Sequence, residues 1–217
     1  MAIDKLQIAA DNAVNQALRI KKGESFLLIT DSQKLPIAEA IARAAKAAGA
    51  ETTTYLMTET LRPIAEPTKL FRELAPKASV MLYMLEGRVP EKNFRGYMVA
   101  TGEKYGRICM MPGISEDMMR RLVAIDFRSL AAFTRKVAAA LKDADDVVVT
   151  NPAGTNIAFS VKGRPWRLDV GNIGKKGMHG NLPAGECFTA PVESTFTGRL
   201  AISLIDDKLG RGVLEFA

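Results

Sequence analysis

The sequence predicts an α/β fold, an open and mostly parallel sheet with flanking helices, followed by a β-rich second domain. In the first half, segments with helical periodicity alternate with short apolar runs, which is the pattern of βαβ units. After Asn151, Gly and Pro recur every few residues and the β-like runs are short. We therefore expect an α/β, Rossmann-like domain over 1–125, and a helix plus β-rich domain over 126–217.

The elements of the first domain follow from apolar periodicity and from turn signals. SFLLIT at 25–30 is short, apolar and followed by Asp31, as expected of a buried strand that meets a loop. Ser115 is expected to cap a helix whose first turn carries Glu116 and Asp117. Helices are expected over 3–19, over 37–48, near 69–74 and from Pro90 to about Thr101, and strands over 25–30, 51–57, 79–85 and 107–111.

The second domain begins with an amphipathic helix. Apolar residues recur at helical spacing over 127–142. Short β-like runs follow, and strands are expected at 147–150, 156–161, 166–170, 188–192, 199–205 and 212–216.

Composition limits the classes of partner. The chain has 217 residues and a net charge of +6, but it has no basic tail and no dense Lys/Arg run interleaved with aromatic residues. No run of eighteen apolar residues occurs. We therefore expect neither nucleic acid nor a membrane as a partner.

The start of the chain and its cysteines suggest a compartment. MAIDKLQIAADNA has neither the charged nor the apolar region of a secretory signal, and Cys109 and Cys187 are the two cysteines. The expectation is a cytoplasmic protein with free thiols.

Common catalytic designs are missing from the sequence. It contains no GxGxxG after the first strand, no P-loop motif and no CxxC, and His179 is the single histidine. One histidine argues against most zinc sites, which use several His or Cys ligands. Carboxylates are therefore the groups expected to carry chemistry.

The most unusual segment is GMHGNLPAGECFTAPVE at 177–193, which combines one His, two Glu, three Gly and two Pro. Glu186 and Glu193 are its carboxylates. Their odd spacing places them on opposite faces if the chain between them is extended. Each residue also has an ordinary interpretation: His179 as an exposed loop residue, Glu193 as a solvated charge, and Glu186 as either a ligand or a surface group.

GNLPAGECFTAPVE at 180–193 resembles the metal-binding signature of the aminopeptidase T and aminopeptidase S family. Further segments resemble that family in the same order along nearly the whole chain: KGE before FLLITD, AAGAE, MPGISEDMMRR and NPAGTNIAFSVKGRPW.

The resemblance implies a metal-dependent aminopeptidase that hydrolyses N-terminal peptide bonds through a metal-activated water. It places Glu186 as a ligand to a divalent metal (Co, Zn, Mn or Mg) and makes Glu193 a second candidate, as a metal neighbour or as a binder of the substrate amine. It also implies a homodimer acting on a peptide or small-molecule substrate.

The family's other ligands lie beyond the point that corresponds to residue 217. This leaves three interpretations: a fragment of a longer protein, a short relative that has lost the metal site, or a site completed by a partner chain. Two other functions stay open. One is a non-catalytic binding or assembly module, and the other is a relative of 2,5-dihydroxypyridine dioxygenase, an iron enzyme of the same architecture.

Overall fold

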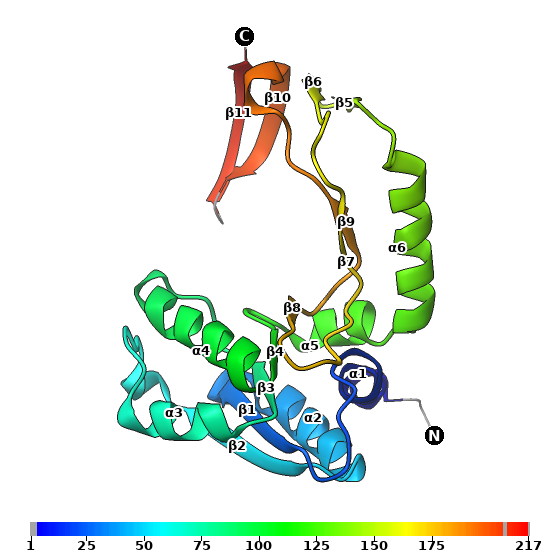
Figure 1. Cartoon of the computed structure of the whole chain (residues 1–217). Coiled ribbons are helices and arrows are strands. Elements are labelled where there is room, and N and C mark those ends of the chain that lie inside the picture. Colours follow the sequence, from blue (N-terminus) through cyan, green and yellow to red (C-terminus); the bar gives the residue numbers. More distant parts are fainter. Residues whose placement is uncertain (1–3, 206–207, 217) are drawn as a thin grey trace. The chain divides into compact units, whose positions relative to one another are not determined.

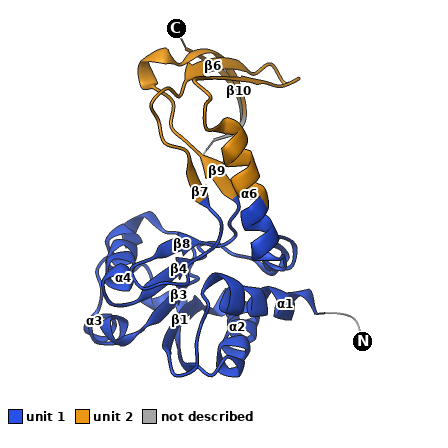
Figure 2. Cartoon of the chain, turned by 45° about the vertical axis from the view of Figure 1, so that its right-hand side comes forward, with its two compact units in different colours: residues 1–132, 169–185 blue, residues 133–168, 186–217 orange. Residues whose placement is uncertain are grey.

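The computed structural model describes residues 4–205 and 208–216. The chain divides into two compact units, coloured separately in Figure 2. Unit 1 contains 1–132 and 169–185, and unit 2 contains 133–168 and 186–217.

Unit 1 is built on a parallel five-stranded sheet with the order β2-β1-β3-β4-β8 (Figure 1). Its strands are β1 (Ser25–Asp31), β2 (Glu51–Met57), β3 (Val80–Tyr83), β4 (Arg107–Met110) and β8 (His179–Asn181). The chain first moves from β1 to β2 and then returns to place β3 on the other side of β1. The strand order therefore reverses between β1 and β3, and ligands of open α/β sheets bind at the carboxyl ends of strands at such a reversal.

Helices cover both faces of this sheet. They are α1 (Lys5–Asn12), α2 (Leu35–Ala47), α3 (Lys69–Leu74), α4 (Lys92–Tyr105) and α5 (Glu116–Met118), with π turns at Ala13–Ala17 and Met119–Val123 and 3-10 turns at Ser32–Lys34, Glu59–Leu61, Ala75–Lys77 and Val89–Glu91. α1 and α2 pack with alternate residues of β1, such as Phe26 and Leu28, while α3 and α4 pack with Leu27 and Ile29. Burial on both faces explains why SFLLIT is continuously apolar.

Local signals in the sequence place several of these elements. β2 and α3 have the predicted bounds, and Ser115 caps α5 by accepting a hydrogen bond from the Met118 backbone N–H. Asp4 caps α1 in the same way through the Leu6 N–H. Met81 of β3 and Met110 of β4 are buried in the core, where flexible methionine side chains commonly fill gaps.

β8 was not expected, and it changes the division of the chain. The sequence suggested two consecutive domains, 1–125 and 126–217, with the GNLPAGE segment in the second. Instead 169–185 returns to unit 1, because His179–Asn181 pairs in parallel with Ile108–Met110 of β4. The side chain of Ile173 lies 3.0 Å from where a Cβ on Gly180 would be, so glycine allows this close packing.

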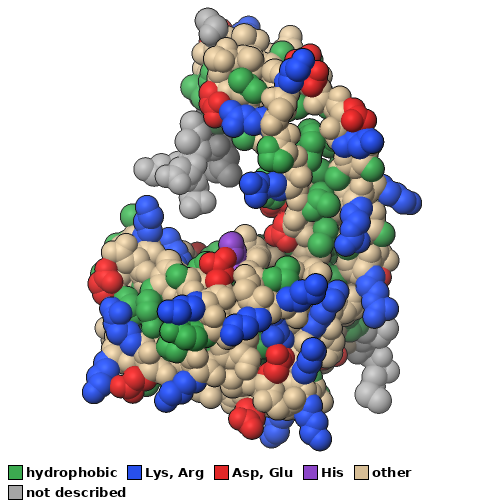
Figure 3. Space-filling view, in the orientation of Figure 1, with side chains coloured by type: hydrophobic (Ala, Val, Ile, Leu, Met, Phe, Trp, Pro, Cys, Tyr) green, Lys and Arg blue, Asp and Glu red, His purple; other side chains and the backbone are tan. Residues whose placement is uncertain are grey.

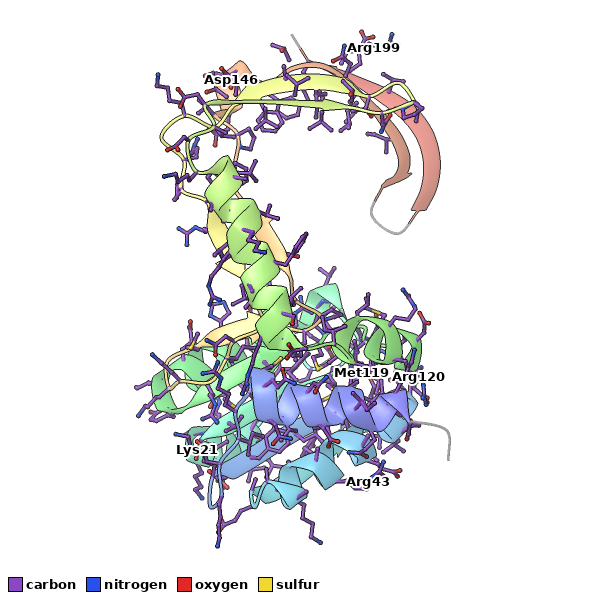
Figure 4. All side chains as sticks on the ribbon, turned by 90° about the vertical axis from the view of Figure 1, so that its right-hand side faces the viewer. Lys21, Arg43, Met119, Arg120, Asp146 and Arg199 are labelled. Atoms are coloured by element: carbon purple, nitrogen blue, oxygen red, sulfur yellow. The ribbon has the colours of Figure 1, made fainter. Side chains whose placement is uncertain are left out.

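Unit 2 is dominated by antiparallel strands. β5 (Asp146–Thr150), β6 (Asn156–Ser160), β10 (Thr197–Ile205) and β11 (Lys208–Phe216) form a sheet with the order β11-β10-β6-β5. Figure 4 labels Asp146 on β5 and Arg199 on β10. Phe196 joins two elements of this unit, since its ring stacks on Phe159 and meets the edge of Phe216.

The division into units falls within α6 (Phe127–Leu141), whose first six residues belong to unit 1. Two short strands, β7 (Arg167–Asp169) and β9 (Glu186–Phe188), form a separate two-stranded sheet. The expected strand at 188–192 is wrong: β9 ends at Phe188, and the 3-10 turn Glu193–Thr195 follows. Pro191 lacks the N–H that a strand ladder needs. No helix in the described ranges is long and apolar enough to cross a membrane.

Candidate functional site

Glu186 begins β9 directly after a conformationally special glycine. Gly185 has φ +122°, and a Cβ at this position would lie 2.9 Å from the Leu130 side chain. Its N–H donates to the Asp169 carbonyl at 3.0 Å. A residue with a side chain is strained in this conformation, so glycine fixes the bend that leads into Glu186. The Glu186 carboxylate is exposed to solvent.

Glu193 is engaged by a cation. Its Oε2 lies 2.5 Å from Nη2 of Arg164, and its side chain is 79% exposed. Arg164 is itself 36% exposed, so the two side chains form a surface ion pair. The structure thus gives Glu193 an ion-pair role and shows no contact between it and Glu186.

His179 forms a polar pair that the sequence did not predict. Its Nδ1 lies 2.6 Å from Oε1 of Glu103, which belongs to α4. Figure 3 shows the histidine in purple at the surface, next to acidic atoms. Both side chains are about half exposed, so the pair lies in solvent, in agreement with the ordinary interpretation of this histidine.

The described residues were expected to supply metal ligands, and Glu186 and Glu193 stay predicted ligands. Among residues 4–205 and 208–216, no three His, Cys, Asp or Glu side chains form a group that could hold a metal ion. Cys109 is buried in the core, and burial raises the pKa of its thiol. Both cysteines are free thiols, as predicted.

A cluster of buried and partly buried charged side chains lies at the carboxyl ends of β1 and β3, where the strand order reverses. Asp31, the last residue of β1, is 1% exposed and accepts a hydrogen bond from Lys34 Nζ at 2.9 Å. Lys34 Nζ also lies 3.5 Å from Oε2 of Glu86, which follows β3. Asp31 was noted in the sequence only as the residue that ends a strand.

A buried ion pair completes this cluster. Arg62 donates to Glu91 through Nε at 2.9 Å and through Nη2 at 2.5 Å, and both side chains are fully buried. Burial opposes ionisation of Glu91, but the hydrogen bonds from Arg62 and from the Ile64 N–H hold the pKa of Glu91 below its ordinary value. Within the described ranges, Arg62 Nη1 and Tyr83 Oη have no hydrogen-bond partner.

Unit 2 contains a small pocket close to Glu186 in the sequence. It has a volume of about 270 Å³ and is lined by Arg164, Pro165, Arg167, Phe188, Thr189 and Ala190. Two arginines and an exposed phenylalanine line this cavity. The sequence analysis did not predict this pocket. Two features of the sequence pointed to it: Arg164 and Arg167 lie on either side of the only tryptophan, and Phe188 follows Glu186 by two residues.

Comparison with known proteins identifies the family. The sequence model of the family described as 2,5-dihydroxypyridine 5,6-dioxygenase matches residues 98–209, just over half of the chain. The chain belongs to this family. Comparison with the sequences of characterised proteins gives no significant match.

Two solved structures share the fold. The 2,5-dihydroxypyridine dioxygenase of Pseudomonas putida KT2440 aligns with a TM-score of 0.64 at 16% identity, over 99% of this chain and 66% of that chain. AmpT from Thermus thermophilus aligns with a TM-score of 0.67 at 18% identity, over 98% of this chain and 69% of that chain. The chain therefore spans about two thirds of the length of each.

The α/β fold with a β-rich continuation is confirmed. The resemblance to aminopeptidase T is confirmed as a likeness of fold, because at 18% identity structural similarity shows no more than that. The family whose model matches is the dioxygenase family, which the sequence analysis held as an alternative.

Proposed function

We propose that this protein acts in the oxygen-dependent cleavage of a hydroxylated, pyridine-type aromatic ring. The observation that carries this proposal is the family match over residues 98–209, which runs from α4 into β11 and includes Glu186. The likeness to the P. putida dioxygenase supports the same scaffold.

The family chemistry implies a bound iron ion, which needs several ligating side chains close together. Glu186 is one exposed carboxylate, and a lone carboxylate binds a divalent ion weakly. Because no group of three ligating side chains exists in the described ranges, the residues present do not fit a metal centre by themselves. We assign no reaction step to a metal, and Glu186 stays a proposed single ligand.

Oxygen uptake tests the proposed function. The purified 217-residue chain is incubated with iron(II) and 2,5-dihydroxypyridine, and oxygen consumption is followed with an electrode. We expect uptake that depends on both the iron and the ring compound when a partner chain completes the iron site, because the described residues do not form one by themselves. Iron binding, measured by equilibrium dialysis, is expected to fall in Glu186→Gln and to be unchanged in Glu193→Gln, because Glu193 is held by Arg164.

Each result has a defined meaning. Folded protein that binds iron but consumes no oxygen with dihydroxypyridines contradicts ring cleavage. Equal iron binding by wild type and Glu186→Gln contradicts the role of Glu186. Folded chain without iron binding and without uptake supports a non-catalytic binding or assembly module.

Aminopeptidase activity is the second candidate, favoured by the GNLPAGECFTAPVE segment and by the shared fold with AmpT. Its test is the release of p-nitroaniline from leucyl p-nitroanilide with added cobalt or with EDTA. Metal-dependent release without oxygen uptake would replace the dioxygenase proposal.

A homodimer is also proposed, with the free edge of β2 as the contact surface. The Glu51 N–H donates to the Glu24 carbonyl of the neighbouring strand segment at 2.9 Å. Alternate residues of a parallel strand bond to opposite neighbours, so Thr52, Thr54 and Leu56 direct their backbone groups away from β1. β2 is an edge strand, and an unprotected edge favours pairing with another chain.

Charges on α2 support this contact. Glu39, Arg43 and Lys46 line a groove together with Thr52 and Thr54, and Figure 4 shows Arg43 on this helix. The acidic residue lies toward the start of α2 and the basic residues toward its end. A two-fold axis through the β2 edge would bring opposite charges of two copies together.

A further inference from the structure

We propose that the pocket of unit 2 lined by Arg164, Arg167 and Phe188 binds a small aromatic ring carrying one anionic group, such as a monocyclic aromatic carboxylate. This arginine pocket is lined by six residues: Arg164, Pro165, Arg167, Phe188, Thr189 and Ala190.

The backbone around the arginine pocket is held by hydrogen bonds. The Arg164 N–H donates to the Val161 carbonyl at 2.9 Å and closes a tight turn. Gly163 has φ +73° in this turn, a conformation that favours glycine. The Thr189 hydroxyl donates to the Pro165 carbonyl at 3.1 Å, so the two walls of the pocket are joined directly.

The two arginines differ in their charge balance. Arg164 is neutralised by Glu193 at 2.5 Å. Within the described residues, the side chain of Arg167 makes no hydrogen bond or ion pair, and Arg167 is one of the residues that line the pocket. The pocket therefore presents one uncompensated positive charge, and a guanidinium binds carboxylates through two parallel hydrogen bonds.

Phe188 supplies the aromatic component. Its side chain is 46% exposed, which leaves part of the ring available for contact. An aromatic ligand stacked on Phe188 or placed edge to face against it would remove this apolar surface from water. The combination of one free guanidinium and one exposed ring selects for a ligand that has both an anionic group and a ring.

The size of the cavity limits the ligand. Drug-sized ligands occupy pockets of roughly 300–1,000 Å³. A volume of about 270 Å³ lies just below that range and accommodates a single substituted ring.

The pocket can be related to Glu186 through strand geometry. Glu186 and Phe188 are two residues apart on β9, so their side chains leave the same face, with about 7 Å between their positions along the strand. A ring bound against Phe188 would thus lie near Glu186, the proposed metal ligand. This connection to ring cleavage rests on the proposed function, whereas binding to the pocket does not.

Trp166 provides a direct probe of binding. It is the only tryptophan and lies between two residues that line the pocket, Pro165 and Arg167. Benzoate and pyridine-3-carboxylate are titrated into the metal-free full chain, with tryptophan fluorescence and calorimetry as the readouts. Benzamide supplies the same ring without the charge, and acetate supplies the charge without the ring.

We expect benzoate to bind at least tenfold more tightly than either benzamide or acetate. Arg167→Gln is expected to weaken benzoate binding about tenfold or more, because a charged hydrogen bond is lost. Phe188→Leu is expected to weaken benzoate more than acetate. Arg135→Gln, an exposed arginine of α6 in the same unit, is the matched control and should leave binding unchanged.

Three outcomes would overturn the proposal: no benzoate binding at millimolar concentration, equal binding of benzoate and benzamide, or equal effects of Arg167→Gln and Arg135→Gln. Oxygen uptake is measured separately. Benzoate binding without oxygen uptake would contradict the proposed function but support the binding pocket. Oxygen uptake, together with benzoate binding that Arg167→Gln does not weaken, would contradict the binding pocket but support the proposed function.

Discussion

Replacing Glu91 with glutamine removes one charge from a fully buried ion pair. The Glu91 carboxylate accepts hydrogen bonds from Arg62 Nε and Nη2, and from the Ile64 N–H at 3.1 Å. Glutamine keeps one acceptor oxygen and turns an amide NH₂ toward one of these donors. The guanidinium of Arg62 then has as its nearest buried anion Asp31, 3.6 Å from Nη1.

The expected loss of stability is large. Breaking a buried pair by removing one partner costs about 3–5 kcal/mol, and here Asp31 compensates Arg62 only in part because it also pairs with Lys34. With a slope of about 2 kcal/mol per molar urea, the unfolding midpoint falls by about 2 M. Far-ultraviolet circular dichroism during urea titration measures this shift.

Glu59→Gln is the matched control. Glu59 also faces Arg62, at 3.9 Å from Nη1, but its side chain is 47% exposed. Partly exposed pairs contribute about 0–1 kcal/mol, so its effect is expected to be several times smaller. If Glu91→Gln and Glu59→Gln destabilise the protein equally, the buried network does not hold the carboxyl edge of the sheet together.

Three further changes test other parts of unit 1. Hydrogen bonds from Arg107 hold the pKa of Glu24 below its ordinary value, so this carboxylate stabilises the fold above its unfolded-state pKa and loses that contribution as the pH falls through the folded-state pKa. The gap in urea stability between wild type and Glu24→Gln should therefore narrow on acidification, and a constant gap would contradict this. In the proposed dimer, Thr54→Lys would bring the lysines of two copies together across the β2 edge. Their repulsion should shift the dimer toward monomer in sedimentation velocity, whereas Thr54→Val should not. A methyl group on Gly106 would meet backbone atoms 2.3 Å away, so Gly106→Ala should lower stability by about 1–3 kcal/mol or more, while Gly96→Ala in α4, with nothing within 4 Å, should not lower it.

Local patterns predicted the fold well because most elements are defined by their own sequence. Strand 51–57 and helix 69–74 have the predicted bounds, since β-branched residues and apolar spacing act within each segment. The three-residue strand at 179–181 could not be predicted in this way. It exists because its neighbour, β4, offers an unpaired edge, which is a property of the assembled sheet.

The polar cluster was missed for a similar reason. Arg62 and Glu91 are 29 residues apart, and neither has a local motif that indicates burial. Their pairing depends on β2 and β3 lying on either side of β1, which the sequence pattern implies only as a general α/β arrangement. Glu186 could be singled out because its glycine- and proline-rich surroundings are unusual locally, but the ion pair of Glu193 with Arg164 depends on the fold of unit 2.

The charge of the arginine pocket bears on the choice between the two candidate functions. An aminopeptidase must bind the free ammonium group of its substrate, and a buried or oriented carboxylate is the natural partner of that group. In unit 2, Glu193 is already paired with Arg164, and the uncompensated group that lines the pocket is the Arg167 guanidinium. A positive charge beside an exposed phenylalanine repels an ammonium group and attracts an anionic ring. Within the described residues, the charge of the pocket therefore fits the proposed aromatic anion better than the ammonium group of a peptide.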